Sequence, residues 1–204
     1  MRRRISNLCL WTMALALTLT PVHGIPCSAF YGENGSESVM GKSYDWHFSH
    51  GYMIVNKRGV EKKSFTIYPK DKQLRWQSQY GSVTFNQYGH EFPLGGLNES
   101  GLAIEVLWLS SSQYPDGGAL PSVNELQWIQ YHLDTAGNVR EMIENAQRIR
   151  ISPVIAEVHY LACDAYGIAQ FLNINKELVI HSTTPLSQPM DARSITNNTF
   201  TTNL

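Results

Sequence analysis

The sequence predicts an α+β domain in which helices pack on stacked sheets. Strand-like segments fill residues 27–112, two amphipathic helices follow between residues 122 and 149, and strand patterns return between residues 158 and 181. Each helix carries one apolar stripe, and the face of a sheet is the partner that would bury it. Because no linker or internal repeat interrupts this order, we expect residues 27–204 to form a single domain.

The first half of the domain is expected to consist of short strands rich in β-branched and aromatic residues. Turn residues, such as those at 32–35 and 57–59, separate these strands. Residues 95–101 are interpreted as a tight loop that leads into a mostly apolar segment, which is typical of a central buried strand. The strands are expected at residues 28–31, 38–44, 52–56, 63–68, 82–85 and 102–109.

Two capping boxes predict where the helices begin. Ser122 with Glu125 forms the first box. Asn138 with Glu141 forms the second. Apolar residues recur at helical spacing behind each box, so the two helices are expected to form an antiparallel hairpin.

Three further strands are expected after the helices. Residues 158–162 and 168–174 flank a turn at residues 164–167 and are interpreted as a β-hairpin. Residues 178–181 are expected to form another short strand. The segment from residue 183 onward is polar and rich in Pro and Asn, so it is interpreted as a tail.

Residues 1–26 have the organisation of an export signal followed by a short pro-segment. Three arginines at residues 2–4 precede an apolar run over residues 8–19, which is short for a membrane span. Val22 and Gly24 are the small residues expected ahead of a cut after Gly24. An uncleaved anchor is the alternative interpretation. We expect an exported protein with no membrane-spanning segment once the signal is removed.

Cys27 lies about where the mature chain would begin. Once everything ahead of it is removed, its thiol and its own α-amine become a nucleophile and a base on one residue, and no histidine is needed. A cut after Gly24 leaves Ile25 and Pro26 in place, so this use of Cys27 requires their removal as well. The alternative is a disulfide with Cys163, since only these two cysteines follow the signal.

Four short segments carry a resemblance to known enzymes. They are Cys27-Ser28, Gly41-Lys42-Ser43-Tyr44-Asp45-Trp46, Gly96-Leu97-Asn98-Glu99-Ser100-Gly101-Leu102-Ala103 and Ile195-Thr196-Asn197-Asn198. In this order they resemble the choloylglycine hydrolase family, which includes penicillin V acylases, bile salt hydrolases and related linear-amide C–N hydrolases. The resemblance implies an N-terminal-nucleophile hydrolase with an αββα sandwich fold. Because family members continue well beyond the position of Asn197, it also implies that the sandwich is incomplete at its C-terminus.

The resemblance implies a catalytic role for four residues. Cys27 matches the nucleophile, Asp45 the carboxylate that orients its amine, and Asn197 the side-chain donor of the oxyanion hole. Lys42 stands where the family usually has an arginine. It keeps the positive charge, which would favour the thiolate form of Cys27, but lacks the planar guanidinium that can donate two hydrogen bonds to one partner. Each of the last three has a structural alternative: a turn carboxylate for Asp45, a loop residue for Asn197 and a solvated surface cation for Lys42.

Two tryptophans bear on the substrate. Trp46 and Trp108 fall where some Gram-negative penicillin V acylases line the acyl pocket with aromatic residues, although both would also suit a hydrophobic core. The implied reaction is hydrolysis of a small-molecule N-acyl amide through an acyl-enzyme, with Asn197 and a backbone N–H near Trp108 stabilising the oxyanion. An aromatic or fatty acyl group, as in penicillin V or N-acyl homoserine lactones, is favoured over a bile salt. No metal or other cofactor is needed.

Charge and glycosylation sequences bear on partners and location. The net charge of −1 carries no electrostatic signature of binding to nucleic acid or anionic membranes. A glycan on the acceptor sequence that begins at Asn197 would conflict with an oxyanion role, which favours a bacterial periplasmic or secreted protein.

Two other functions stay open: a secreted β-rich binding protein with a Cys27–Cys163 disulfide, and a truncated family member without activity. The sequence leaves homo-oligomerisation open as well.

Overall fold

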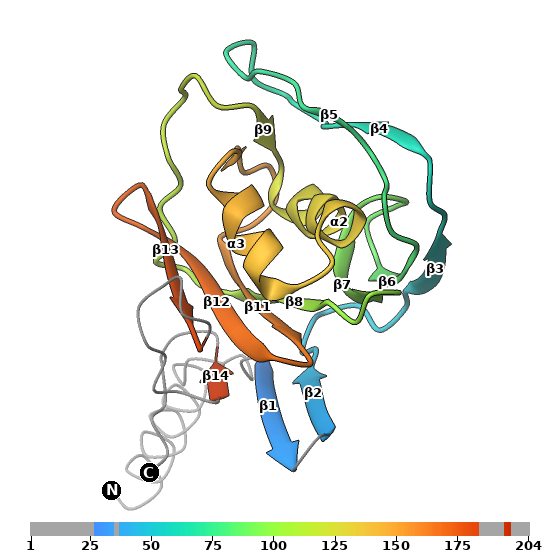
Figure 1. The fold of residues 1–204 in the computed structure, drawn as a ribbon. Helices are drawn as coiled ribbons and strands as arrows, with labels where there is room; N and C mark the ends of the chain where they lie inside the picture. The colour runs from blue at the N-terminus through green and yellow to red at the C-terminus, as the bar shows by residue number, and fades with distance from the viewer. Residues whose placement is uncertain (1–26, 35–36, 184–193, 197–204) are drawn as a thin grey trace, which may run out of the picture.

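The computed structural model describes residues 27–34, 37–183 and 194–196 (Figure 1). Its largest element is a seven-stranded sheet with the strand order β13-β12-β11-β8-β7-β6-β3, in which every neighbouring pair is antiparallel. The strands are β3 (Tyr52–Asn56), β6 (Ser82–Asn86), β7 (Pro93–Asn98), β8 (Ala103–Trp108), β11 (Val158–Asp164), β12 (Gly167–Ile174) and β13 (Glu177–Ser182).

Two helices, α2 (Glu125–Thr135) and α3 (Val139–Ala146), cover one face of this sheet (Figure 1). Trp128 of α2 stacks on Tyr160 of β11 with 4.0 Å between the ring centroids, and it meets Phe171 of β12 edge-on at 5.2 Å. All three rings belong to the main apolar core between the helices and the sheet. Burying both apolar stripes against the sheet is what the helical periodicity predicted.

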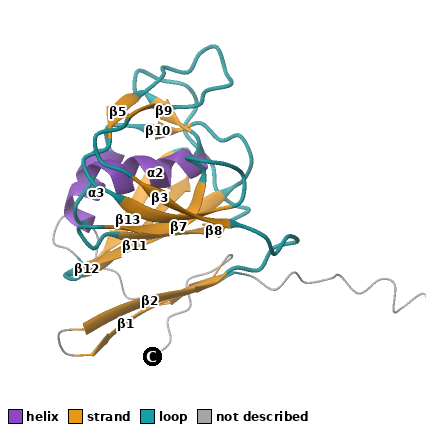
Figure 2. Ribbon diagram, turned by 90° about the vertical axis from the view of Figure 1, so that its right-hand side faces the viewer, coloured by secondary structure: helices purple, strands orange, loops and turns teal. Residues whose placement is uncertain are grey.

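A second, three-stranded sheet lies against the opposite face of the large sheet (Figure 2). Ala29 of this small sheet packs with Leu107 of β8 and Leu161 of β11. Together with the helices, the two sheets make three layers in the order helix, sheet, sheet. The predicted α+β architecture, with helices on stacked sheets, is therefore confirmed. The strand order is β14-β1-β2, with β1 at Ser28–Asn34, β2 at Glu37–Ser43 and β14 at Ser194–Thr196.

Strand β11 shows how the two faces of the large sheet are filled. All of its residues are buried. Tyr160 and Ala162 face the core beneath the helices, whereas Leu161 and Cys163 face the small sheet. This alternation is expected for a strand covered on both sides, and the predicted hairpin of β11 with β12 is confirmed.

The predicted loop at residues 95–101 is wrong in its first half, because those residues belong to strand β7. A Cβ on Gly96 would collide with the carbonyl group of Val83 and crowd Leu133 of α2, so the missing side chain lets the helix approach the sheet closely. The chain turns only after β7, where Gly101 has a φ of 94°. Glycine disfavours strands locally, and here tertiary packing overrides that preference.

Helix α2 begins two residues later than its capping box predicts. Ser122 lies in the short strand β9, and the N-cap is Asn124, whose side chain accepts hydrogen bonds from two N–H groups of the first turn. Glu125 turns its carboxylate to the N–H groups of residues 154–156 and so does not close a capping box with Ser122. At the start of α3, Asn138 is the N-cap as predicted and accepts a hydrogen bond from the N–H of Glu141, whereas the Glu141 carboxylate accepts from the Asn138 side chain and from the N–H of Gly137.

Two short strand pairs complete the structure beside the helices. Strand β4 (Glu61–Lys63) pairs with β5 (Arg75–Gln77) in the antiparallel sense, and β9 (Ser122–Val123) pairs with β10 (Arg150–Ile151) in the parallel sense. The strand predicted at residues 63–68 is wrong, because pairing ends at Lys63. The buried side chains of β4 and β5 are anchored on α2, and this anchor fixes the hairpin two residues earlier than strand propensity suggests.

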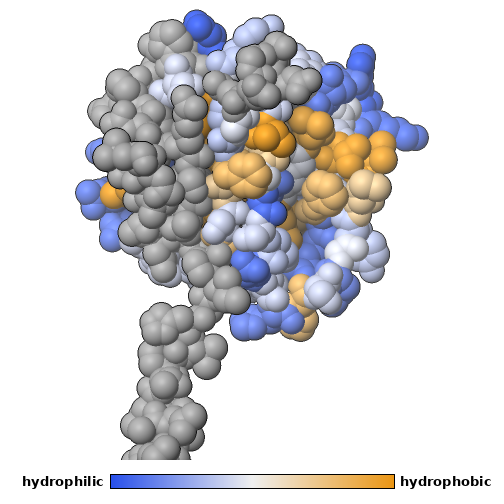
Figure 3. Space-filling view, turned by 90° about the horizontal axis from the view of Figure 1, so that it is seen from below, coloured by the Kyte–Doolittle hydropathy of each residue, from blue (hydrophilic) through white to orange (hydrophobic). Residues whose placement is uncertain are grey.

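The small sheet leaves part of the large sheet uncovered. Seen from its side, apolar side chains gather on the surface (Figure 3), and the exposed apolar residues on this face of β3, β6 and β7 are Met53, Val55, Phe85 and Leu97. Separately, none of the helices among the described residues is long and apolar enough to cross a membrane.

Candidate functional site

Cys27 lies immediately before β1, between the two sheets. It is 6% exposed and packs with Ala29, Leu107 and Leu161. The antiparallel pairing of β1 with β2 brings the chain after β2 back over the cysteine. As a result, the backbone N–H of Asp45 donates a hydrogen bond to the Cys27 Sγ at 3.4 Å. The thiol also donates to the carbonyl oxygen of Asp45 at 3.8 Å, so the sulfur is held by the backbone of one residue in an otherwise apolar layer.

A short chain of hydrogen bonds fixes the carboxylate of Asp45. The Ser43 hydroxyl donates to Asp45 Oδ2 at 3.0 Å, and it accepts from the backbone N–H of Ser28 at 3.1 Å. Asp45 is exposed, and its carboxylate is tied through Ser43 to Ser28, the first residue of β1 and the neighbour of Cys27. Sequence reasoning missed Ser43, although its position between Lys42 and Asp45 in one motif was a usable signal.

An apolar cavity of about 140 Å³ opens beside Cys27. Trp46 and Trp108 both line it, and their rings stack with 5.9 Å between centroids and 29° between planes. The two predicted pocket residues, far apart in sequence, are therefore together at the cavity. Apolar walls next to a thiol suit an apolar group attached to the atom that the thiol would attack. The other walls include Tyr44, Leu94, Leu107, Ile155 and Val158.

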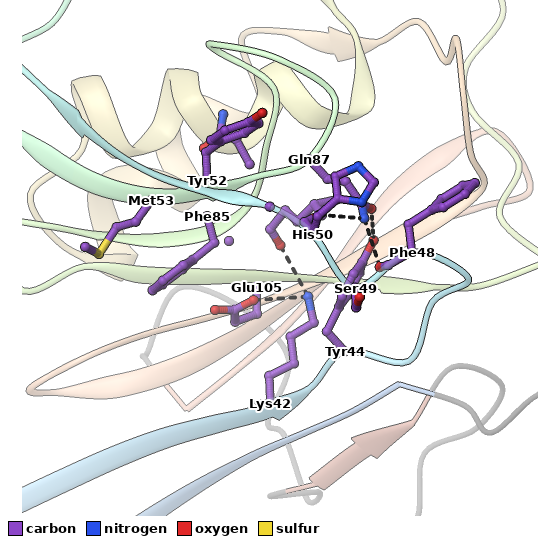
Figure 4. Close-up of a pocket in the computed structure, with 14 residues that line it drawn as sticks. Lys42, Tyr44, Phe48, Ser49, His50, Tyr52, Met53, Phe85, Gln87 and Glu105 are labelled. Atoms are coloured by element: carbon purple, nitrogen blue, oxygen red, sulfur yellow. Dashed lines mark hydrogen bonds and ion pairs between the residues drawn. The ribbon is translucent and has the colours of Figure 1, made fainter.

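The segment between β2 and β3, which carries Asp45 and Trp46, is anchored by Gln87 (Figure 4). The Gln87 Oε1 accepts a hydrogen bond from the hydroxyl of Tyr44 at 2.7 Å, and its Nε2 donates to the carbonyl groups of Phe48 and His50, both at 3.0 Å. Burial raises the pKa of Tyr44, so its hydroxyl stays a donor. Nothing in the sequence pattern pointed to Gln87, because its partners lie about forty residues away.

Replacing Gln87 with leucine is expected to loosen this segment. The variant loses three hydrogen bonds with little change in side-chain volume, so cleavage by chymotrypsin within residues 44–51 should rise about tenfold. The near-ultraviolet circular dichroism of the Trp46–Trp108 pair should weaken in parallel. Gln77→Leu is the matched control, because the side chain of this exposed β5 residue donates one hydrogen bond, to the carbonyl group of Gly59. Equal cleavage of the two variants would contradict the anchoring role.

Lys42 lies in a second cavity, of about 420 Å³, that adjoins the first (Figure 4). Its Nζ is 3.1 Å from Glu105 Oε2 and donates to the carbonyl oxygen of Leu94 at 3.3 Å. The Lys42 side chain is only 8% exposed, so it is not a solvated surface cation. Burial raises the pKa of Glu105, and the charge of Lys42 opposes that rise. Sequence reasoning missed Glu105, although it is the one charged residue of the apolar segment at 102–109.

The other thiol and the nearby histidine belong to the interior. Both cysteines are free, and Cys163 lies 3.6 Å from the sulfur of Met40. Burial raises the pKa of Cys163 to about 12. His159 shares a 2.9 Å hydrogen bond with Gln170, and burial, aided by the charge of Lys42, lowers its pKa to about 4. These properties describe an unreactive thiol and a neutral core histidine.

Asn197, the predicted oxyanion donor, lies outside the described residues. Its neighbour Thr196 pairs with Ser28, the residue that follows Cys27. The part of the chain that the structure describes contains no group of three or more His, Cys, Asp or Glu side chains arranged to hold a metal ion. The geometry around Cys27 therefore consists of a thiol, a fixed carboxylate, an apolar cavity and a neighbouring ion pair.

Comparisons with known proteins place these features in a wider context. Residues 27–186 match the family described as linear amide C–N hydrolases, choloylglycine hydrolase family. A penicillin V acylase from Pectobacterium atrosepticum is 26% identical over 209 residues, which is 88% of this chain and 52% of the relative. The solved penicillin V acylase from Agrobacterium tumefaciens is 31% identical with a TM-score of 0.68, over 85% of this chain and 53% of that one.

A more distant structure shares the fold. A variant of the conjugated bile acid hydrolase from Clostridium perfringens superimposes with a TM-score of 0.68 at 15% identity, over 86% of this chain and 54% of the other. The chain thus spans about half the length of each of these relatives.

Proposed function

The chain belongs to the choloylglycine hydrolase family of linear amide C–N hydrolases, and from this membership we propose that it hydrolyses an N-acylated amine with Cys27 as its N-terminal nucleophile. Its fold is the αββα sandwich of the N-terminal-nucleophile hydrolases, of which the described residues form one helix layer and two sheets. The observation that carries the proposal is the buried thiol of Cys27 at the end of an apolar cavity.

The proposed reaction begins after residues 1–26 have been removed, the first part as an export signal. The Cys27 thiol gives its proton to its own α-amine, and the sulfur forms a bond to the amide carbonyl carbon. The C–N bond then breaks as the protonated α-amine passes its proton to the leaving nitrogen. Water, deprotonated by the same amine, attacks the thioester; the acid leaves and the thiol regains its proton.

Two predicted residues are proposed to support this chemistry. Asp45, fixed by Ser43, would orient the ammonium form of the Cys27 amine. Asn197 would donate to the oxyanion, where the loss of one donor typically costs about 10²–10³ in rate. The pairing of Thr196 with Ser28 supports that role. Thr196 directly precedes Asn197, and Ser28 directly follows Cys27 at the start of β1.

The acyl part of the substrate is proposed to be aromatic or fatty, because stacked Trp46 and Trp108 form the cavity beside the thiol. Penicillin V, the substrate named for two relatives, and N-acyl homoserine lactones both meet this requirement. We favour these substrates over bile salts, since the bile acid hydrolase resembles this chain in fold alone. We also propose a bacterial periplasmic or secreted location, on the basis of residues 1–26.

The test is to export the full chain from a bacterial host, measure its mass, and incubate it with a phenoxyacetyl amide. The expected chain begins at Cys27, hydrolyses the amide, and gains one acyl group when the reaction is quenched in acid. A mature chain that keeps Ile25 and Pro26 would rule out the α-amine as the base. A correctly processed chain that binds the amide without cleaving it would overturn the proposal in favour of an inactive relative.

A further inference from the structure

We propose that Glu125 is a positioning residue for the acyl group, because its carboxylate holds one wall of the apolar cavity beside Cys27. The proposal rests on the function proposed above and deepens it, since it names a residue through which the site favours large apolar acyl groups. Glu125 is the first residue of α2 and is fully buried. It acts through the loop of residues 152–157, which joins β10 to β11.

This loop supplies part of the cavity wall. Ile155 and Ala156 line the cavity together with Leu126, the residue that follows Glu125 in α2. Residues 152–157 belong to no helix or strand. Their positions therefore depend on individual hydrogen bonds and not on the ladder of a sheet, so this wall is only as fixed as those bonds.

Three successive N–H groups of the loop donate to the one carboxylate. The N–H of Val154 donates to Glu125 Oε2 at 2.9 Å, and the N–H groups of Ile155 and Ala156 both donate to Oε1. Hydrogen bonds to a carboxylate are stronger than those between neutral groups. The start of a helix also favours a negative charge, so α2 stabilises the carboxylate in this place. The middle of the loop is thus held against the first turn of α2.

Other contacts fix the two ends of the loop. The N–H of Ser152 donates to the backbone of β9 at 2.9 Å, and the carbonyl oxygen of Glu157 accepts from the N–H of Leu109 at 2.9 Å. The hydroxyl of Tyr114 donates to the carbonyl oxygen of Ala156 at 3.3 Å. Because these contacts do not involve the Glu125 carboxylate, weakening its bonds should loosen the wall and leave the ends of the loop in place.

A wall that is fixed in advance matters most for an acyl group that reaches it. The cavity of about 140 Å³ is small beside the roughly 300–1,000 Å³ of typical ligand pockets, so a large acyl group must pack on most of its walls. A preorganised wall binds such a group more tightly, since less freedom is lost on binding. An acetyl group ends one carbon beyond the carbonyl and gains little from the loop.

Two chromogenic amides test this role, because the phenoxyacetyl and acetyl amides of 4-nitroaniline differ only in the acyl group. Glu125→Gln keeps the shape of the side chain but presents an NH₂ donor where a loop N–H needs an acceptor. For the phenoxyacetyl amide, KM should rise about tenfold with little change in kcat, and the kcat/KM ratio of phenoxyacetyl over acetyl should fall about tenfold. Glu157→Gln is the matched control, because it removes a charge from an exposed side chain of the same loop and should change neither value.

Ile155→Ala separates positioning from general damage. It removes a side chain of the wall and leaves the Glu125 carboxylate in place, so it should also raise KM for the phenoxyacetyl amide. If Glu125 acts through this wall, the double variant should lose little more than either single variant. Losses that multiply, or a Glu125→Gln variant that slows both amides equally, would show that the bonds only stabilise the fold, and would overturn the proposal.

A measurement on the unmodified protein does not depend on how the variants fold. Saturation with phenoxyacetate, the acid product, should slow hydrogen exchange at the N–H groups of residues 154–156 about tenfold, and acetate should not. Unchanged exchange with phenoxyacetate would overturn the role of the loop. If the processed chain hydrolyses neither amide, the proposed function fails; if it hydrolyses the phenoxyacetyl amide and Glu125→Gln leaves its KM unchanged, only the role of Glu125 fails.

Discussion

Replacing Cys27 with alanine is expected to lower amide hydrolysis on the order of 10⁴-fold or more. Alanine has no nucleophilic side chain, so the acyl-enzyme cannot form at this residue. The fold should survive, because the side chain is small and its surroundings, Ala29, Leu107 and Leu161, are apolar. Hydrolysis of a phenoxyacetyl amide and thermal unfolding, measured on the same preparation, separate the two effects.

Cys163→Ala is the matched control for this prediction. Cys163 is the other free thiol, it is buried beside Met40, and burial raises its pKa to about 12. The control should keep its activity, and iodoacetamide should label Cys27 alone in the folded wild-type protein. Activity that survives in Cys27→Ala, or that disappears in Cys163→Ala, would contradict the assignment of the nucleophile.

The layered fold could be predicted because its signals are local. Helix α3 begins at the predicted N-cap, Asn138, and β11 with β12 forms the hairpin predicted from two strand-like segments around a short turn. Strand β7 could not be predicted, because Gly96 there is selected by how closely α2 packs on it. Likewise Asn124 caps α2 without help from Glu125, whose carboxylate is used by a loop thirty residues away.

The same division holds for the site. Cys27, Asp45, Trp46 and Trp108 were predicted from the resemblance to a family, and the structure brings Cys27 and both tryptophans to one cavity, with the backbone of Asp45 bonded to the Cys27 sulfur. Gln87 was missed because its role consists of contacts across about forty residues of chain. Ser43 and Glu105 were missed as well, since each contacts a residue on another strand, Ser28 for Ser43 and Lys42 of the small sheet for Glu105. Motifs therefore identify candidate catalytic groups better than the groups that position them.

Removing the charge of Asp134, in α2, is expected to lower the free energy of unfolding more than removing any other single charge. Its carboxylate accepts hydrogen bonds from Trp76 Nε1 at 2.7 Å and Gln130 Nε2 at 2.9 Å, and it lies 3.0 Å from the Nζ of Lys62. Both charged side chains are almost fully buried, at 2% exposure for Lys62 and 0% for Asp134. Asp134→Asn leaves the ammonium of Lys62 buried without a counter-charge, which typically costs about 3–5 kcal/mol.

Urea unfolding of Asp134→Asn measures this cost, which is a large part of the roughly 5–15 kcal/mol that stabilises a domain. Adding Lys62→Met should restore much of the stability, because the double variant removes the unpaired charge as well as its partner. Asp116→Asn is the matched control, since Asp116 pairs with Lys176 in full contact with solvent and should show no measurable loss. If Asp134→Asn were as stable as this control, the pair would not be what holds the β4–β5 hairpin on α2.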